Sequence, residues 1–595
     1  MGRIKFKIRW KRFFISLVII SYAYSVYNLY IGISNYFSFI SQESDQIRRK
    51  QIQDVMKNAW NSYREHAWGY DFLNPQTRHG ENWYGLGYTI IDSLDTLILM
   101  GMNDEFDEAL EWINNSFQYW LPFTGEVSFF ETVIRSLGGL LTAYEQTHNK
   151  ILLEMAEEIG NRLLPDFNTP SGLPRVLINL MTGLQNDHPW ANGSSLLADA
   201  GSCQIEFLAL SYHTGKSIYY EKSMYARRKL LRFGPIPPTQ IFYKSLWPSI
   251  TQYSFDAFGD SYFEYLLKLK LYAPYNLTDE DRPLEFRHAI EEALNRLAFT
   301  SWETGHEYLT TSINDEFTHG ISHLSFFLPG TLFLAAQQDC MYNKYFFCNQ
   351  KRRCKLKNPT IERNRENINL YTKSHQNNHR QKLIKSKNKS GYILNNDSNS
   401  ESHFMDHLYE YDYDCDFDFD CDCDCHCECD NKSDCKCCGK SKYYELYLSL
   451  ANSLLDTAIY LYKIQPTKIG GESARFTTKK PGVYWSDDTY KLRPELVESL
   501  FYSWRTTHNI KSKMVAWEIF ESIRKYCQTD AGYTTVHQTS TPIVIYDDLQ
   551  DSFFLSETLK YLYLIFSDDD VFSLDDYVFT TQAHPLKKLL YKKSS

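Results

Sequence analysis

Apolar residues recur three and four positions apart along most of this chain. The runs TVIRSLGGLLTAYEQ, which begins at Thr132, and HAIEEALNRLAFTSWETG, which begins at His288, are examples. This spacing is typical of one face of a helix, and it extends over residues 51–338 and again from Tyr443 to about Tyr591. Alternating patterns are too short for a sandwich, and Gly, Pro and Asn mark the turns. The pattern therefore predicts an all-α fold of antiparallel helix pairs.

The helical pattern is interrupted over residues 341–442. The composition there changes first to Lys, Asn, Gln and Ser, and then to an alternation of Asp and Cys. Such a segment cannot bury enough apolar surface to order itself, so we expect a disordered low-complexity insertion. It would divide one catalytic domain into a first part, 51–340, and a second part, 443–591. Neither part has a repeat of fixed period, which favours a closed toroid of helices over a solenoid.

Nine of the 14 cysteines lie in the Asp/Cys part of this insertion, between Cys415 and Cys438. Their spacing does not repeat a CxxC pair, as a tetrahedral zinc site would require. Incidental thiols or irregular disulfides are therefore favoured over a zinc-binding loop. The other five cysteines are too scattered along the chain for pairs to be assigned.

The N-terminus has the pattern of a membrane anchor. Residues 1–12 hold six basic side chains and no acidic one, and residues 13–34 are mostly apolar and long enough to cross the hydrocarbon layer as a helix. A stem, residues 35–50, would follow. No small-residue cleavage site is obvious, which favours an uncleaved signal anchor over a cleaved signal peptide. Both alternatives put the catalytic domain in the lumen, and the first predicts a single-pass type II protein of the endoplasmic reticulum or Golgi membrane.

Six Asn-x-Ser/Thr sequons are compatible with a lumenal domain, although such triplets also occur by chance. They lie at Asn114, Asn192, Asn276, Asn388, Asn396 and Asn431.

Composition narrows the functional classes. A chain of 595 residues with 43% hydrophobic residues can bury a large core. The net charge of −10 comes without a basic stripe in the helical parts, so we expect no nucleic-acid partner. The aromatic content of 16% suits carbohydrate binding, but most aromatic side chains fill cores.

Acidic residues in apolar surroundings are the main candidates for chemistry. In SFFETVIRSLGG, Glu131 and Arg135 lie four residues apart on one helical face. An exposed ion pair at this spacing would be purely structural. The flanking residues are nearly all apolar, however, so we expect the pair to be buried and functional.

Two further clusters have a similar pattern. In FGDSYFEYLLK, Asp260 and Glu264 lie four residues apart, although Ser261 and Glu264 also fit a capping box that would leave Asp260 at a helix entry. In LRPELVESLFYSW, the proline can begin a helix whose inner side carries two carboxylates next to an arginine. Carboxylates that repel each other favour a functional pocket. This third cluster consists of Arg493, Glu495 and Glu498.

Splitting a glycosidic bond requires an acid for the departing oxygen and a base or nucleophile at the anomeric carbon. The three clusters supply such carboxylates. Thr581, in VFTTQAHPL near the C-terminus, could offer its hydroxyl and its carbonyl oxygen to a hard cation. By itself, a threonine is more simply an ordinary turn residue.

The assembled strings resemble the class I α-mannosidases, glycoside hydrolase family 47, in family order over residues 51–590 apart from the insertion. They are WGYDFLNPQTRHGENWYGLGYTIIDSLDTL, FFETVIRSLGGLL, GDSYFEYLLK, HLSFFLPGTL, LRPELVESLFY, DSFFLSETLKYLYLIF and VFTTQAHPL. The resemblance implies an (α/α)₇ barrel that acts as a monomer and cleaves terminal α-1,2-linked mannose from high-mannose N-glycans of glycoproteins. It also implies dependence on Ca²⁺ and inversion of the anomeric configuration.

The resemblance also assigns roles to residues. Glu131 matches the family's acid, Asp260 a second candidate acid, and Glu495 the base. Thr581 matches the direct calcium ligand, with the O2 and O3 hydroxyls of mannose and waters completing the shell. The positions that match sugar-binding or stacking residues are Arg135, Glu206, Glu264, His323, Arg493, Glu498, Phe553 and Glu557.

Three positions depart from the family pattern. Phe326 stands where many members have a disulfide cysteine, so that crosslink is expected to be absent. Gln582 replaces the glutamate of the usual TEAHP string, which could weaken the calcium shell. Phe258 stands where enzymes of the endoplasmic-reticulum type usually have arginine, which leaves branch specificity open.

Two alternatives remain at the level of sequence. One is a quality-control factor of the degradation-enhancing branch of this family, which would recognise the glycans of misfolded glycoproteins. The intact acidic positions favour turnover over recognition alone. The other, a structural membrane protein with a metal-binding Cys-rich loop, does not explain the ordered motifs.

Overall fold

A computed structural model of the chain describes residues 44–118, 121, 124–273, 284–349, 442–479 and 482–589. The predicted tail, anchor and most of the stem, and nearly all of the predicted insertion, lie outside these residues. No helix within the described ranges is both long and apolar enough to span a bilayer. The chain separates into two compact units, Met1–Asp339 with Lys442–Ser595, and Cys340–Ser441.

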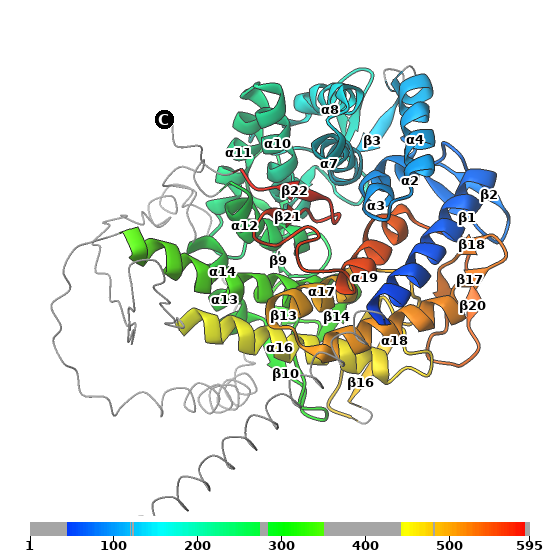
Figure 1. Cartoon of the computed structure of the whole chain (residues 1–595). Coiled ribbons are helices and arrows are strands. Elements are labelled where there is room, and N and C mark those ends of the chain that lie inside the picture. The colour runs from blue at the N-terminus through cyan, green and yellow to red at the C-terminus, as the bar shows by residue number, and fades with distance from the viewer. Residues whose placement is uncertain are drawn as a thin grey trace, which may run out of the picture. The chain divides into compact units, whose positions relative to one another are not determined.

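The first unit is mostly helical, as the sequence predicted (Figure 1). Within the described residues, seven helical segments contact one another in a closed series, in which each packs against the next and the last packs against the first. In chain order they are α2 (Tyr88–Asp92) with α3 (Leu94–Leu99); α6 (Phe129–Glu131), η3 (Thr132–Leu137) and α7 (Gly138–Thr147); α10 (Gln204–Thr214); α12 (Asp260–Tyr272); η6 (His323–Phe327) with α14 (Leu328–Asn349); α17 (Glu495–Thr507); and η7 (Phe554–Thr558) with α19 (Leu559–Ile565).

Further helices pack against members of this series. For example, α8 contacts α7 and α10, α11 contacts α10, and α18 contacts α17 and α19. The further helices are the helix over 44–66, α4 (Asn103–Trp112) with η1 (Ile113–Phe117), α8 (Lys150–Leu163) with η4 (Leu164–Phe167), α9 (Leu197–Gly201), α11 (Ile218–Leu231), α13 (Leu284–Arg296), α16 (Lys442–Lys463) and α18 (Ile510–Tyr526).

Short turns explain why successive helices run antiparallel. His148 directly follows α7 and His508 directly follows α17, and both are in the left-handed conformation, with φ of 56° and 51°. The following residues, Asn149 and Asn509, cap the next helix, because each side chain accepts a hydrogen bond from a backbone N–H two residues later at 3.1 Å. The same Thr-His-Asn sequence therefore makes both hairpin turns.

The strands are short hairpins and three-stranded sheets at the ends of helices, and three of them lead directly into helices: β3 into α6, β6 into α9 and β14 into η6. The two-stranded pairs are β1 (Phe72–Asn74) with β2 (His79–Glu81), β10 (Ala298–Thr300) with β11 (Glu307–Leu309), β17 (Gln528–Thr529) with β18 (Gly532–Tyr533), β19 (Val536–His537) with β20 (Ile545–Tyr546), and β21 (Tyr577–Phe579) with β22 (Pro585–Lys587). The three-stranded sheets are β3 (Glu126–Ser128), β4 (Leu177–Asn179) and β5 (Gln185–Asn186); β6 (Ser194–Leu196), β7 (Gln240–Phe242) and β8 (Pro248–Ile250); β9 (Gln252–Tyr253), β12 (Ser312–Ile313) and β13 (Glu316–Phe317); and β14 (Gly320–Ser322), β15 (Ser473–Phe476) and β16 (Val483–Asp487).

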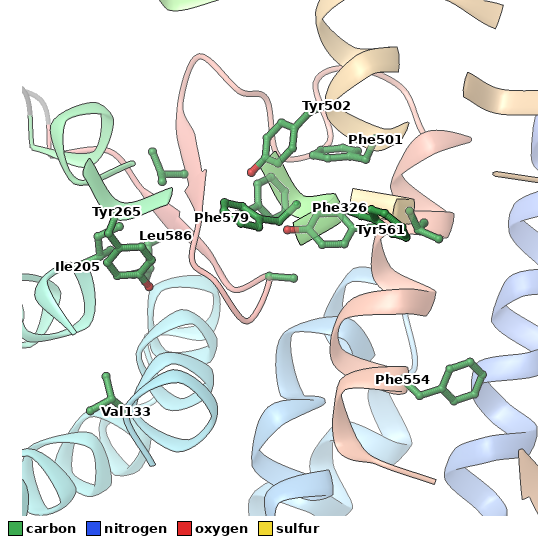
Figure 2. Close-up of a cluster of buried hydrophobic side chains, with 14 of the residues drawn as sticks. Val133, Ile205, Tyr265, Phe326, Phe501, Tyr502, Phe554, Tyr561, Phe579 and Leu586 are labelled. Atoms are coloured by element: carbon green, nitrogen blue, oxygen red, sulfur yellow. The ribbon is translucent and has the colours of Figure 1, made fainter. Parts of the chain in front are cut away.

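The last hairpin, β21–β22, lies among the helices of the series. Strand β21 contacts α12 and β22 contacts α7. Figure 2 shows Phe579 of β21 beside aromatic rings of the neighbouring helices, and its ring centroid lies 5.3 Å from that of Phe501 and 5.8 Å from that of Tyr561. Burial of these rings anchors the hairpin, and the turn between its strands carries Thr581.

Candidate active site

The predicted catalytic carboxylates all lie at the beginning of helices in the closed series. Glu131 ends the single turn of α6 that continues into η3, Asp260 is the first residue of α12, and Glu495 is the first residue of α17. Local sequence fixes two of these starts: the Ser128 hydroxyl accepts a hydrogen bond from the Glu131 N–H at 3.2 Å, and Pro494 precedes Glu495. The partial positive charge of a helix N-terminus favours negative groups at these positions.

Glu131 forms the predicted ion pair with Arg135, in which the arginine is buried and the glutamate is partly exposed. The Nε of Arg135 donates to the Glu131 carboxylate at 2.7 Å. The Nη1 of the same guanidinium donates to Asp551 at 2.7 Å and to the Ser552 hydroxyl at 2.6 Å. Arg135 is buried, and although burial opposes its charge, Asp551 and Glu131 raise its pKa further above the usual value. The arginine thus holds Glu131 in a fixed position.

Asp260 has a pKa that burial and repulsion raise towards neutrality. Burial, followed by the charges of Asp256, Glu264 and Glu495, raises its pKa to about 7, although a hydrogen bond from the Ser261 N–H at 2.7 Å opposes the shift. The alternative capping box is not formed, because the helix begins at Asp260 and its N-cap, Gly259, has no side chain to accept a bond. Near neutral pH, Asp260 can therefore hold a proton for transfer.

Glu495 contacts a histidine and lies near an arginine. His323 Nδ1 lies 2.6 Å from the Glu495 carboxylate, and His323 Nε2 lies 2.5 Å from the Tyr462 hydroxyl. Arg493 Nη1 is 3.9 Å from Glu495, while its Nε and Nη2 bind Glu472 at 3.0 and 2.8 Å. His323 is buried and its ring contacts the Glu495 carboxylate directly. Its role in this arrangement is to position Glu495.

Glu264 and Glu498 share one buried cation. The Lys268 ammonium forms an ion pair with Glu264 and lies 3.4 Å from Glu498. The Tyr561 hydroxyl also lies 3.4 Å from Glu498. Burial, despite the attraction of Lys268, raises the pKa of Glu498 to about 8, and repulsion from Glu264 and Glu495 adds to the shift.

Glu206 is linked to the turn of the last hairpin. The Tyr265 hydroxyl donates to Glu206 Oε1 at 2.6 Å, and the Thr581 N–H donates to the Tyr265 oxygen at 3.3 Å. Burial raises the pKa of Glu206 to about 7. Its second oxygen is buried and has no hydrogen-bond partner within the described part of the chain.

Glu557 and Phe553 lie close to the arginines of the site. Phe553 lies between the Arg135 and Arg493 guanidinium groups, at 5.8 and 5.4 Å from its ring centroid. Glu557 is buried, and burial together with the charges of Asp92 and Glu495 raises its pKa well above the usual value. Neutralising this carboxyl requires a proton or a cation.

The structure brings the predicted carboxylates into one electrostatically connected group. The charge of Glu495 raises the pKa of Asp260, Glu498 and Glu557. Burial, and then the charges of Glu131 and Asp260, raise the pKa of Asp199, which connects these two acids. Thr581 joins the group through Tyr265 and Glu206. Among the described residues, no three or more His, Cys, Asp or Glu side chains are arranged to hold a metal by themselves.

Sequence reasoning missed a buried charge network beneath this group. Asp92 accepts hydrogen bonds from Ser556 Oγ at 2.9 Å and Gln582 Nε2 at 3.0 Å, and it lies 3.2 Å from His584 Nε2. His584 Nδ1 lies 3.3 Å from Asp95. Two acids in the apolar run YTIIDSLDTL were the signal that could have indicated it.

The sequence matches the profile of glycosyl hydrolase family 47 over residues 55–357 and 360–588. The chain belongs to this family. It is therefore a glycoside hydrolase, as the motifs predicted.

Proteins similar to this chain are consistent with its membership of the family. Mannosyl-oligosaccharide 1,2-alpha-mannosidase MNS1 of Arabidopsis thaliana is 32% identical over 554 residues, which cover 91% of this chain and 79% of the relative. Mannosyl-oligosaccharide 1,2-alpha-mannosidase IB of Homo sapiens is 30% identical over 562 residues, or 92% of this chain and 71% of the relative. The solved structure of the alpha-1,2-mannosidase from Trichoderma reesei superposes with a TM-score of 0.68 at 20% identity and covers 91% of this chain and 99% of that one. This likeness shows that the fold is shared.

The three departures from the family 47 pattern have structural counterparts. Phe326 is buried and packs against His323 and Tyr462, with centroids 5.0 and 6.5 Å apart. Aromatic ring packing therefore stands where many family members have the disulfide cysteine, and Cys203 and Cys527 are both free and buried. Gln582 donates to Asp92, a bond that an ionised glutamate could not make. Phe258 is exposed, with φ of 71°, and stacks on Trp190 with a centroid distance of 5.3 Å.

Proposed function

We propose that this family 47 hydrolase removes terminal α-1,2-linked mannose from high-mannose N-glycans, with inversion of configuration and with Ca²⁺ as cofactor. The observation that carries the proposal is the connected group of carboxylates at the starts of α6, α12 and α17. The proposed substrate is inferred from the names of the similar proteins, which are mannosyl-oligosaccharide 1,2-alpha-mannosidases. A deep group of acids surrounded by buried side chains suits attack at the end of a glycan rather than within it.

The acid and base roles follow from what holds each carboxylate. Asp260, with its pKa near 7, can deliver a proton to the departing oxygen near neutral pH, and Glu131 is a second candidate that Arg135 positions. Glu495, which His323 holds, would take a proton from the attacking water. Inversion leaves room for that water when the facing carboxyl groups are about 6.5–9.5 Å apart.

The residues around Thr581 fit a calcium ion. The turn offers the hydroxyl and carbonyl oxygens of Thr581, and Tyr265 links Thr581 to Glu206, whose second carboxylate oxygen is buried without a partner among the described residues. Glu498 and Glu557 of the connected group are also buried with raised pKa values. Buried carboxylates in excess of their cationic partners favour a divalent ion, and Ca²⁺ accepts neutral oxygens and water in its shell. Bound there, calcium would supply a positive charge that grips the sugar hydroxyls.

We also infer that the closed series of helices is the inner layer of an (α/α)₇ barrel. The contacts of α8, α11 and α18 with the inner helices support a second, outer layer. A single N-terminal membrane helix over residues 13–34, a monomeric state, and residence in the endoplasmic reticulum or Golgi with a lumenal catalytic domain remain part of this proposal.

A single assay tests the proposal. The full-length protein is incubated with a nine-mannose N-glycan, with and without a calcium chelator, and released mannose is quantified. We expect release that the chelator abolishes and added Ca²⁺ restores. Glu131→Gln, Asp260→Asn and Glu495→Gln should each lower the rate by roughly 100-fold or more. Glu521→Gln, an exposed carboxylate on α18, is the matched control and should retain the wild-type rate.

Three results of this assay would contradict different parts of the proposal. Mannose release that persists in the chelator would contradict the calcium site. Glycan binding without release would replace hydrolysis by the quality-control alternative. Unchanged rates in the three variants would remove these carboxylates from the reaction.

A further inference from the structure

The segment Trp83–Tyr88 is fixed by one buried carboxylate that the mechanism above does not use. Asp71 Oδ2 accepts hydrogen bonds from the backbone N–H groups of Trp83, Tyr84 and Gly85 at 2.9, 2.7 and 2.7 Å. Its Oδ1 accepts from the next three N–H groups at 2.8, 2.8 and 3.3 Å. A carboxylate bound by several N–H groups holds a loop in one conformation. The backbone that carries the side chains of this segment is therefore fixed before any ligand arrives.

The Tyr84 ring is held on the inner side of this segment. It stacks on Trp83 with a centroid distance of 4.7 Å and an interplanar angle of 28°. It also packs against a small apolar cluster separate from the main core, formed by Val176, Leu177, Ala191 and Leu196. Trp83 itself is 47% exposed, so the pair leads from the interior towards solvent.

The Tyr84 hydroxyl is buried without a hydrogen-bond partner among the described residues. Burial raises its pKa well above the usual value, and the charges of Glu131 and Asp199 raise it further. The hydroxyl therefore remains protonated and can donate to an incoming oxygen. A buried hydroxyl that is left unsatisfied costs stability. The cluster that Tyr84 packs against includes Leu177, and Leu177 pairs with Ser128, the residue that caps the helix turn carrying Glu131.

We propose that Tyr84 binds the substrate glycan, with its hydroxyl donating to a sugar hydroxyl and Trp83 stacking on the adjoining sugar. The sugar concerned would be the unit that remains on the glycan after cleavage, because Trp83 lies towards solvent, whereas the proposed function puts the terminal mannose among the buried carboxylates near Thr581. This inference rests on the proposed function. The polyhydroxylated face of a mannose suits one fixed phenolic donor next to an aromatic surface.

The test removes only the hydroxyl, with Tyr84→Phe. We expect KM for the nine-mannose glycan to rise roughly fivefold to tenfold with kcat nearly unchanged, because the lost bond binds substrate and transition state alike. The melting midpoint should not fall, because the lost hydroxyl has no partner in the folded protein. Tyr272→Phe is the matched control: its hydroxyl is also buried without a partner among the described residues, at the far end of α12 from Asp260. It should leave KM unchanged.

A binding measurement separates this inference from the proposed function. Calorimetry with the same glycan is performed on Glu495→Gln and on Glu495→Gln with Tyr84→Phe. We expect Kd to increase by the same fivefold to tenfold factor, whether or not the wild type releases mannose. If the wild type binds the glycan without releasing mannose and Tyr84→Phe still increases Kd, the proposed hydrolysis is overturned but the role of Tyr84 is not. Equal Kd values, or a lowered melting midpoint with KM unchanged, would overturn the role of Tyr84.

Discussion

Asp260 illustrates how the environment of a side chain decides its chemistry. Among the acids of the site, the buried Glu264 pairs with Lys268 and the buried Asp92 with His584, whereas the half-buried Asp260 has only a backbone N–H and a neighbouring hydroxyl to stabilise its charge. Burial therefore raises its pKa to about 7. A carboxylic acid that is half protonated near neutral pH is suited to general acid catalysis.

This shift predicts a pH-dependent gain in stability for Asp260→Asn. In the folded protein the pKa of Asp260 is about 7, which is above its value in the unfolded chain. The free energy of unfolding of the wild type therefore falls as the pH rises from the unfolded pKa to the folded pKa, and the loss is complete above the folded pKa. Asparagine carries no such loss. In chelator at about pH 8, the variant should be more stable by about 2 kcal/mol, a figure reduced because the side chain is partly exposed, while activity falls. Urea unfolding at about pH 3, below both pKa values, should show almost no gain; an equal gain at both pH values would contradict this assignment.

At this scale, the sequence indicates which acids matter but not what holds them. Family resemblance identifies Glu131, Asp260 and Glu495 as candidates. The partners of His323 are Glu495 and Tyr462, which lie 172 and 139 residues away in the chain. Contacts of this kind depend on the closure of the helical series, and no local pattern contains them.

The helix start is the structural element that builds the site. Glu131, Asp260, His323 and Glu495 each lie in the first turn of a helical segment in the closed series, so the fold assembles the site from segments far apart in sequence. Periodicity predicted these helices. It did not predict the strands, because pieces of two to five residues are too short to show alternation.

Close packing between α2 and α7 depends on a glycine. A Cβ at Gly139 would lie 2.6 Å from the backbone oxygen of Ile91, which cannot move without shifting α2. Gly139→Ala should therefore lower the free energy of unfolding by about 2 kcal/mol, despite the higher helix propensity of alanine. At Gly125, a Cβ would meet no atom within 4 Å, so Gly125→Ala serves as the control in the same urea titration. Equal unfolding midpoints for the two variants would mean that the helices can separate at little cost.

On the scale of the whole molecule, the C-terminal hairpin completes the site. It brings Thr581 to Tyr265 and Glu206 and brings His584 between Asp92 and Asp95. The all-α class could be predicted from periodicity, and the order of the motifs predicted the family. The position of this hairpin among the helices could not be predicted from the sequence, because it depends on burial of Phe579 and Leu586 against residues from several segments (Figure 2).

Proton NMR of the full-length protein acting on the nine-mannose glycan tests the central claim most directly. An inverting enzyme that cuts α-1,2 linkages must first release mannose as the β-anomer, which then equilibrates in water. We predict that signals of the terminal α-1,2-linked mannose decline while free β-mannose appears ahead of the α-anomer. An absence of free mannose would contradict the activity, and early appearance of the α-anomer would contradict the roles given to the carboxylates.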